Sequence, residues 1–301
     1  MKKKLLPILI CLLYFFSCDK KPNKLLNQKE HEELIDSWVE NRLASLKKDD
    51  GWLNLIGLHW ISNSETSMGS ADYNDILLPA DKFPEKIGTF FWQDSILTFT
   101  PKIDGITYNG QMVESPMILY TSGLDEPTKT LSLGSLLWTI IIRGDALGVR
   151  IRDLDASAIS DFKGIPRFAT SLDWRLKGEF TPYEFGKELS ITNVLGQTSI
   201  NLSPGFVSFE KDGKVYQLDA LDANNQLYLI FADASSGLET YGGGRYLYID
   251  KPAPKKTEVI IDFNKAYNPP CVFTAYATCP LPPRENILDL YISAGEKYMD
   301  K

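Results

Sequence analysis

Two carboxylates in the last third of the chain, Glu239 and Asp262, are the residues best suited to acid and base chemistry. In such a pair one carboxyl group serves as general acid or base and the other as nucleophile or positioning group, as in glycosidases. Asp233 is a third carboxylate in the same region. We therefore predict Glu239 and Asp262 as the catalytic residues of a metal-independent hydrolase. The alternative is a buried network of charged groups that only stabilises the fold.

Polar and aromatic side chains that could hold a ligand lie around these carboxylates in the sequence. Arg245 follows three glycines, and a glycine-rich turn that leads into an arginine is suited to binding an anion. Farther upstream Arg150 and Arg152 alternate with apolar residues, so on a strand both guanidinium groups leave by one face. The alternative for each arginine is pairing with a nearby carboxylate. The predicted ligand-binding residues are Tyr241, Arg245, Asn264, Tyr267, Asn268, Arg150 and Arg152.

The remaining residue types argue against other kinds of catalysis. No Gly-x-Ser-x-Gly motif occurs, and the only two histidines, His31 and His59, are predicted to be structural. Cys271 and Cys279 have no neighbouring histidine and would supply only two of the four ligands that a structural zinc needs. We therefore predict no metal site and no cofactor. The two cysteines are predicted either to form a disulfide in an oxidising compartment or to remain buried thiols.

The first residues have the features of a bacterial lipoprotein signal. Lysines at positions 2–4 precede an apolar run at 5–16, which is too short to span a membrane, and a small residue then precedes Cys18. This resembles a lipoprotein cleavage site, which implies removal of residues 1–17, a lipid on Cys18 and a short tether over 18–26. The alternative is an ordinary signal peptide with an unmodified cysteine. We expect a lipid-anchored protein of the bacterial cell envelope, on the periplasmic or outer-membrane side.

The charge of the chain limits its partners. Loss of residues 1–17 would remove three lysines and change the formal net charge from −7 to −10. An acidic protein without a basic run is a poor candidate for binding nucleic acid or anionic headgroups, since it cannot replace their counterions. We therefore predict no nucleic-acid partner and contact with the membrane only through the lipid. A small-molecule ligand is compatible with this charge, and protein partners are left open.

One amphipathic helix is predicted over residues 27–50. Asn27 is a suitable N-cap, and Glu30 stands three residues on, where it can return the hydrogen bond. Acidic and basic residues occupy the outer face of this helix. Its apolar face is predicted to consist of Leu34, Ile35, Trp38, Val39, Leu43 and Leu46.

The rest of the chain has the pattern of a mostly β protein. Short apolar runs recur about every ten residues, and Asp104-Gly105, Asn109-Gly110 and Asp212-Gly213 are suited to hairpin turns. The fold class predicted is an antiparallel β-sandwich or barrel with one N-terminal amphipathic helix. We predict two β domains, a sandwich over 51–124 and a larger domain over 125–301 that contains the candidate site.

Residues 52–120 resemble a forkhead-associated β-sandwich. The resemblance rests on Gly69-Ser70, Asn74-Asp-Ile-Leu77 and Asn109-Gly110. That family holds phosphothreonine with an arginine and a serine, but Ser70 stands in place of the arginine, and Ile87-Gly-Thr89 supplies no Ser-x-x-His. The resemblance therefore implies a scaffold without phosphopeptide binding.

A second resemblance extends over the whole chain. Its most specific part is Asp262-Phe-Asn-Lys-Ala-Tyr-Asn-Pro-Pro-Cys271, followed by Cys279-Pro-Leu-Pro-Pro283. These residues resemble the bacterial family catalogued as domain of unknown function 1684, which implies kinship and no activity. Further matching strings are Asp50-Gly-Trp-Leu53, Gly57-Leu-His-Trp60, Arg150-Ile-Arg-Asp153, Ser236-Gly-Leu-Glu-Thr-Tyr241 and Gly244-Arg-Tyr-Leu247.

The functional hypothesis from the sequence is an envelope lipoprotein whose C-terminal β domain binds a small anionic or hydroxylated ligand in a polar pocket. Two alternatives stand beside it. One is acid and base hydrolysis by Glu239 and Asp262, and the other is a non-catalytic structural or interaction module of the envelope.

Overall fold

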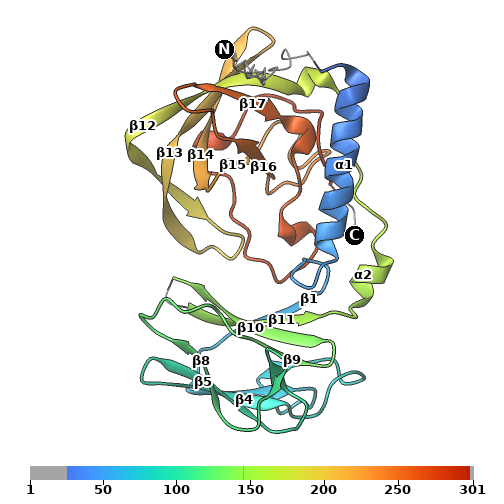
Figure 1. The fold of residues 1–301 in the computed structure, drawn as a ribbon, viewed down its shortest axis with the longest axis vertical. Helices are drawn as coiled ribbons and strands as arrows, with labels where there is room; N and C mark the ends of the chain where they lie inside the picture. The colour runs from blue at the N-terminus through green and yellow to red at the C-terminus, as the bar shows by residue number, and fades with distance from the viewer. Residues whose placement is uncertain (1–25, 145, 299–301) are drawn as a thin grey trace, which may run out of the picture.

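A computed structural model describes residues 26–144 and 146–298 of the 301-residue chain. The expected signal segment and the expected lipidation residue Cys18 lie outside the described residues. The described chain forms two β units arranged end to end, with a long helix beside one of them (Figure 1). The prediction of a mostly β, antiparallel fold with one main helix near the N-terminus is confirmed. Within the described residues no helix is both long and apolar enough to cross a membrane.

Helix α1 (Gln28–Leu46) begins with the expected capping box. The Asn27 side chain accepts a hydrogen bond from the backbone N–H of Glu30, and the Glu30 side chain returns one to the N-cap. The helix ends at Leu46, earlier than expected, because the N–H groups of Trp52 and Leu53 both turn back to the carbonyl of Leu46. Its end is therefore fixed by the chain that follows it.

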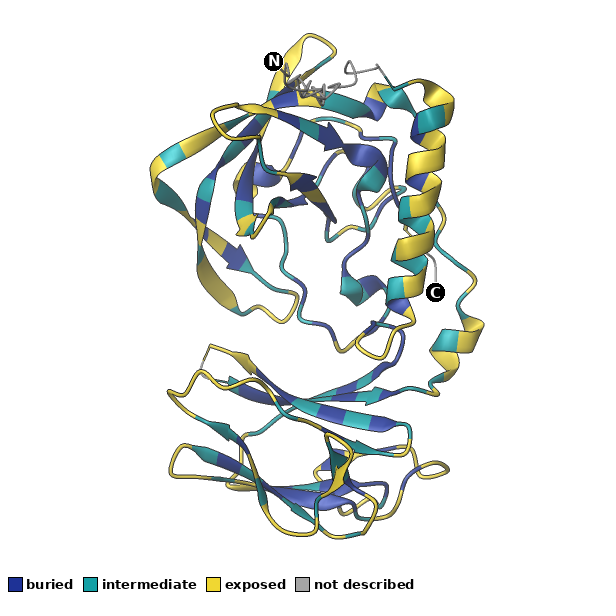
Figure 2. Ribbon diagram, in the orientation of Figure 1, coloured by how far each residue is buried: buried dark blue, intermediate teal, exposed yellow. Residues whose placement is uncertain are grey.

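The buried face of α1 differs from the expected one. His31, Ile35 and Leu46 are buried, whereas Leu34 is 55% exposed. His31 and Ile35 are one helical turn apart and share a face, which the helix turns toward the C-terminal unit, while the opposite face is open to solvent (Figure 2). The prediction that Leu34 belongs to the buried face was wrong. The helix contacts the C-terminal unit partly through the polar residue His31, which a pattern of apolar residues does not include.

The N-terminal unit is a sandwich of two sheets. Its core includes Trp138, Phe90 and Phe99, and the ring of Phe99 lies 5.4 Å from that of Trp138 and 4.9 Å from that of Phe90. All strand pairs are antiparallel except β2 with β3. One sheet has the order β1 (Leu55–Trp60), β11 (Ala146–Asp153), β10 (Leu136–Arg143), β9 (Thr130–Leu133), β6 (Thr107–Tyr108) and β7 (Gln111–Met112). The other has the order β3 (Ile76–Leu77), β2 (Glu65–Gly69), β4 (Gly88–Gln93), β5 (Ile96–Pro101) and β8 (Met117–Thr121).

The boundary between the sandwich and the barrel unit lies later in the chain than the expected position at residue 124. Strands β10 and β11 pair with each other and β11 pairs with β1, so they belong to the sandwich. Trp138, Val149 and Ile151 are fully buried in the sandwich core. Without β9 to β11 the strand β1 would lack its partner, so the sandwich extends to Asp153. The forkhead-associated resemblance remains a prediction.

The C-terminal unit is one strongly curved antiparallel sheet, and Figure 1 shows it bent into a nearly closed barrel. Its core includes Leu229, Leu247 and Phe263, all fully buried. The strand order is β16 (Arg245–Asp250), β15 (Gln226–Phe231), β14 (Lys214–Ala223), β13 (Thr198–Lys211), β12 (Arg175–Thr192) and β17 (Glu258–Asp262). The short helices are α2 (Ser157–Asp161), η1 (Leu172–Trp174), η2 (Phe263–Lys265), η3 (Pro270–Val272) and η4 (Arg284–Asn286).

Helix α1 precedes the sandwich in sequence but binds the barrel unit. His31 Nε2 lies 2.7 Å from Asp262 Oδ2 at the end of β17. Near the other end of the helix, Arg42 Nε donates to Glu296 Oε1 at 3.1 Å. The chain therefore leaves the barrel after α1, builds the sandwich and returns along α1 to begin β12 (Figure 1). This arrangement places α1, the sandwich and the barrel around one space.

Candidate functional site

A cavity of about 560 Å³ lies where α1, the sandwich and the barrel meet. That volume is in the range of small-molecule binding sites, roughly 300–1,000 Å³. Its walls carry arginine, tyrosine and tryptophan side chains, and among the described residues no carboxylate lines it. The lining residues are Trp38, Asn41, Arg42, Ser45, Trp52, Arg143, Arg150, Tyr228, Tyr246, Tyr248, Tyr267, Pro270, Ala277, Thr278, Cys279 and Pro280.

The three arginines of the cavity are neutralised to different degrees. Arg42 has a carboxylate partner, Glu296, and also donates to the carbonyl of Asn268 at 3.0 Å. Within residues 26–144 and 146–298, neither Arg143 nor Arg150 has a carboxylate within ion-pair distance. The cavity therefore has two guanidinium groups whose charge the described protein does not balance locally.

Arg150 is the more enclosed of these two groups. Its guanidinium lies 5.5 Å from the centre of the Trp52 ring, and its Nε is buried without a hydrogen-bond partner in the described structure. Burial, followed by repulsion from Arg152 and Arg143, lowers the pKa of Arg150 to about 10. The group is still cationic at neutral pH. An anion in the cavity would offset the desolvation and repulsion that this charge experiences.

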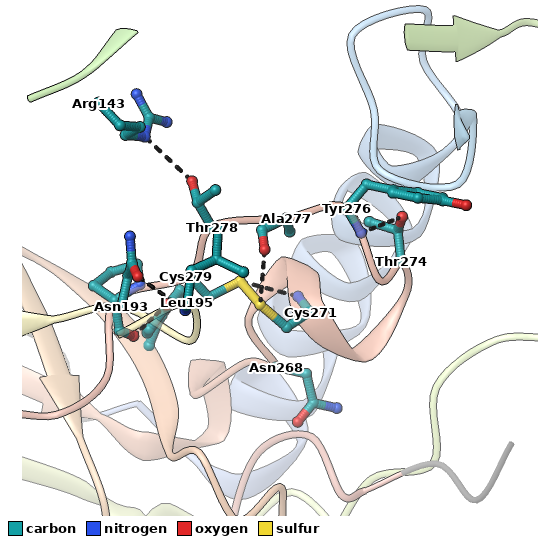
Figure 3. Close-up of a disulfide and its surroundings, with 12 residues drawn as sticks. Arg143, Asn193, Leu195, Asn268, Cys271, Thr274, Tyr276, Ala277, Thr278 and Cys279 are labelled. Carbon is teal, nitrogen blue, oxygen red and sulfur yellow. Dashed lines mark hydrogen bonds between the residues drawn. A yellow bond between two sulfur atoms is a disulfide. The ribbon is translucent and has the colours of Figure 1, made fainter. Parts of the chain in front are cut away.

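Arg143 connects the sandwich to the barrel unit. Its Nε donates to Thr278 Oγ1 at 3.2 Å, and Nη1 donates to the carbonyl of Ile142 at 2.8 Å. Figure 3 shows the side chain reaching from β10 to the loop that contains the disulfide. Arg143 is exposed, so this contact is one that a ligand can replace.

Four tyrosines form the barrel side of the cavity. Tyr228 faces Tyr248 across β15 and β16, and their rings stack at 4.7 Å. Tyr267 stacks on Tyr248 at 6.2 Å, and the guanidinium of Arg42 lies 4.7 Å from the centre of the Tyr267 ring. Burial is the main cause that raises the pKa of Tyr228, Tyr246 and Tyr267. These phenols therefore keep their protons at neutral pH and are hydrogen-bond donors.

A disulfide between Cys271 and Cys279 holds the loop that closes this side of the cavity (Figure 3). The loop is also fixed by its backbone, because the N–H of Val194 donates to the carbonyl of Cys279 at 3.0 Å. Tyr246 Oη donates to the carbonyl of Pro280 at 2.8 Å. The segment that follows Thr278 is therefore held both to the turn after β12 and to β16.

Of the residues predicted to bind a ligand, Arg150 and Tyr267 line the cavity. Arg152 lies behind the wall, where its guanidinium is 5.8 Å from the centre of the Trp52 ring. Its Nη1 donates to Asn54 Oδ1 at 2.6 Å and to the carbonyl of Gly51. Arg152 therefore orders the turn after α1 and has a structural role in this position.

Arg245 lies away from the cavity and is fully buried. Its Nη2 donates to Asp233 Oδ2 at 2.7 Å and to the carbonyl of Ile292 at 3.2 Å, and its Nη1 donates to the carbonyl of Ala294. A guanidinium enclosed by these acceptors joins the start of β16 to the C-terminal segment. Its expected role as a ligand-binding residue receives no support, because no face of it is open.

Asp262 is a structural centre of the contact between α1 and the barrel. Besides His31 Nε2, it accepts hydrogen bonds at Oδ1 from the N–H of Asn264 at 3.1 Å and from Asn264 Nδ2 at 2.9 Å. Asn264 is itself buried and bonded to the backbone of Ser171. These groups satisfy one another, which leaves Asp262 and Asn264 without an open side in the described structure.

Asn268 and Tyr241 also make local contacts. Asn268 is buried, its N–H donates to Glu296 Oε2 at 2.6 Å, and its Nδ2 donates to the carbonyl of Lys297 at 2.8 Å. Tyr241 stacks on Tyr298 with 5.9 Å between ring centres. Neither residue lines the cavity.

Glu239 has partners of its own, separate from those of Asp262. Lys297 Nζ donates to Glu239 Oε1 at 2.7 Å, and the hydroxyl of Tyr291 donates to Oε2. The hydrogen bond from Lys297 and then that from Tyr291 lower the pKa of Glu239. The carboxylate is therefore ionised at neutral pH, which suits a base and not an acid. The paired-carboxylate hydrolase remains a prediction without a shared hydrogen-bond partner or cavity to support it.

Two pairs of cavity residues that sequence reasoning missed come from separate parts of the chain, β16 and α1. Tyr246 and Tyr248 alternate on one strand, a pattern that places both on one face and was available from the sequence. Trp38 and Arg42 are one helical turn apart, which also indicates a shared face. These two pairs line the same cavity only because α1 packs against the barrel. No local sequence pattern indicates that packing.

Replacement of Arg245 by methionine is expected to reduce the free energy of unfolding by about 3–5 kcal/mol, since it leaves the Asp233 carboxylate buried without its partner. The measurement is urea unfolding followed by circular dichroism. Lys177→Gln is the matched control. Its ion pair with Glu258 spans 3.8 Å between side chains that are 70% and 60% exposed, so a change of about 0.5 kcal/mol or less is expected. Equal stability of Arg245→Met and wild type would contradict the structural role.

Removal of the disulfide by Cys271→Ser with Cys279→Ser is expected to lower stability by about 2–3 kcal/mol, because the open loop gains conformational freedom when the chain unfolds. Thermal unfolding with and without a reducing agent tests this. The reductant should lower the melting temperature of the wild type and leave that of the double variant unchanged. A wild-type melting temperature that does not respond to reduction would be inconsistent with the disulfide.

Comparison with known proteins identifies a family to which part of the chain is similar. No curated protein matches the chain. The solution NMR structure of an uncharacterized protein from Haloarcula marismortui is 30% identical to this chain, covers 47% of it and 80% of its own length, and has a TM-score of 0.39. The family model described as protein of unknown function (DUF1684) matches residues 160–297, which contain the whole barrel sheet. Through these residues the chain belongs to that family of unknown function, as its sequence predicted, although the resemblance was expected over the whole chain and the family model matches residues 160–297.

Proposed function

We propose that this protein binds a small anionic, hydroxylated ligand in the cavity between α1, the sandwich and the barrel. The observation that carries the proposal is the pair Arg143 and Arg150, which face a cavity with no carboxylate among its described lining residues. Arg150 is half-buried, so the lack of a counterion among the described residues is costly for it, and an anionic ligand would balance its charge. Arg143 is exposed and adds a second positive charge at the same cavity. The proposal keeps the ligand class expected from the sequence and moves the site from the end of the barrel sheet to the junction of the two units.

The neutral groups of the cavity favour a ligand with hydroxyl groups. Asn41, Ser45 and Thr278 supply short amide and hydroxyl side chains beside the tyrosines. Phenol hydroxyls that keep their protons donate hydrogen bonds to hydroxyl or carboxylate oxygens. Small sites of this kind combine a few polar groups that fix orientation with apolar and aromatic walls.

We also propose that the protein is a lipoprotein of the bacterial cell envelope, attached by a lipid on Cys18. The signal-like sequence of residues 1–17 supports this, and so does the disulfide between Cys271 and Cys279, which suits an oxidising compartment. In this location the ligand would be a small molecule of the envelope or its surroundings.

Binding can be followed through the tryptophans at the cavity, Trp38 and Trp52. Galacturonate, citrate and AMP serve as anionic probes, and galactose serves as the neutral match to galacturonate. We expect a saturable fluorescence change with at least one anion and none with galactose. A hydrogen bond to a charged group contributes roughly 1.5–3 kcal/mol, so Arg150→Gln should weaken that binding by about ten- to a hundredfold.

The control for this experiment is Arg175→Gln, which removes an arginine that does not line the cavity. Its affinity for the anion should equal that of the wild type. The proposal fails if no anion of the panel binds, or if Arg150→Gln and Arg175→Gln bind the anion equally well.

The lipid anchor has a separate test. In cells that produce the full-length protein, Cys18→Ser should move it from the membrane fraction to the soluble fraction and abolish incorporation of labelled palmitate. Because Cys271 and Cys279 are distant from the signal, Cys279→Ser is the control and should retain the label. A labelled Cys18→Ser protein would rule out this attachment site.

A further inference from the structure

A second cavity of about 390 Å³ adjoins the first. The two share four lining residues, Arg143, Tyr228, Thr278 and Pro280. The hydrogen bond from Arg143 Nε to Thr278 Oγ1 therefore joins two residues that line both cavities. Since Arg143 is exposed and spans the two units, it marks the boundary between two parts of one hollow.

The second cavity differs from the first in its chemistry. Arg143 is the charged side chain among its described lining residues, and amide and hydroxyl groups form most of its polar wall. Ile191, Leu221 and Ile230 supply an apolar floor. The neutral polar residues are Asn193, Gln197, Thr198, Ser199 and Asn201.

These amide and hydroxyl groups are mounted on a rigid hairpin. The Asn193 carboxamide donates to Gln197 Oε1 at 2.8 Å and accepts from the N–H of Leu195 at 2.9 Å, which fixes the turn between β12 and β13. Asn201 Nδ2 donates to Ser199 Oγ at 3.0 Å. The turn is held to the disulfide loop by the backbone bond between Val194 and Cys279. A wall fixed in this way suits repeated hydrogen bonds to ligand hydroxyls, because little ordering is needed on binding.

We propose that the two cavities form one site for an acidic oligosaccharide. This inference rests on the proposed function and names its ligand class. The sugar that carries a carboxylate or sulfate group lies in the first cavity against Arg150 and Arg143. Neutral parts of the next sugar units lie in the second cavity against the amides and hydroxyls of β12 and β13.

The tyrosine geometry distinguishes a saccharide from a flat aromatic ligand. Tyr248 stacks on Tyr228 at 4.7 Å and on Tyr267 at 6.2 Å, and the guanidinium of Arg42 lies over Tyr267. Rings stacked on one another offer a ligand their edges and hydroxyls more than their faces. A nucleobase needs a free ring face for stacking, whereas the hydroxyls of a sugar can form hydrogen bonds with the phenol hydroxyls without one.

The test compares ligands that differ in length and in charge, with affinity measured by tryptophan fluorescence and calorimetry. The probes are galacturonate, trigalacturonate, neutral maltotriose and a sulfated galactose oligomer of similar length. We expect trigalacturonate or the sulfated oligomer to bind about tenfold or more tightly than galacturonate, and maltotriose to bind at least as weakly as galacturonate. A preference between the first two tells carboxylate from sulfate recognition.

Variants locate the added affinity. Asn201→Ala should weaken trigalacturonate binding about fivefold or more and leave galacturonate binding unchanged, because Asn201 lines only the second cavity. Asn225→Ala, on the exposed turn between β14 and β15, is the matched control and should change neither affinity. Arg150→Gln should weaken both.

Several results would overturn the inference. One is equal affinity for galacturonate and trigalacturonate, and another is an Asn201→Ala effect that is the same for both lengths. A third is Arg150-dependent binding of citrate or AMP with no binding of any acidic sugar, which would leave the proposed function intact. Failure of every anion, including citrate and AMP, would remove both proposals together.

Discussion

The ion pair between Arg42 and Glu296 fixes the geometry on which the cavity depends. The side chains of Arg42 and Glu296 are only 13% and 1% exposed, and Glu296 also accepts the N–H of Asn268. The guanidinium thereby joins α1 to the last segment of the chain while it lies over the ring of Tyr267. Since α1 precedes the sandwich in the sequence, this contact determines where the sandwich begins relative to the barrel. The walls of the cavity follow from that one placement.

The distribution of carboxylates explains how an acidic chain contains a cationic cavity. The sequence has 39 acidic and 32 basic residues, yet the buried carboxylates are engaged elsewhere. Asp233 is bonded to Arg245, Asp262 to His31 and Asn264, and Glu296 to Arg42. These bonds join the C-terminal segment and α1 to the barrel. Asp233 and Asp262, which the sequence suggested for acid and base chemistry, thus make structural contacts, and among the described residues no carboxylate lies within ion-pair distance of Arg143 or Arg150.

The capping box was predicted correctly and the disulfide was one of two alternatives, whereas the end of α1, part of its buried face and its long-range contacts were not predicted. The capping box joins residues three positions apart, and the disulfide joins residues eight apart, so both lie within reach of sequence patterns. The bond between His31 and Asp262 joins residues 231 positions apart, and His31 was therefore interpreted without its partner. The pairing of β1 with β11 also joins distant residues, such as Leu55 with Arg152, which is why the boundary of the sandwich was expected too early. The fold class could be predicted because short apolar runs and turn residues indicate strands, whichever strands later pair with one another.

The cost of the unbalanced arginines is the strongest physical reason to regard the cavity as functional. Arg150 has a buried Nε without a hydrogen-bond partner in the described structure, and its pKa is lowered by burial and by two neighbouring arginines. Each of these features destabilises the folded protein relative to one with a neutral side chain at that position. The Nε of Arg245 is also buried without a hydrogen-bond partner in the described structure, but its Nη2 donates to the carboxylate of Asp233, so the charge of Arg245 has a counterion within the fold. The difference between the two arginines is therefore the counterion, which the described residues supply to Arg245 and not to Arg150, and this difference supports our proposal that an anion binds in the cavity.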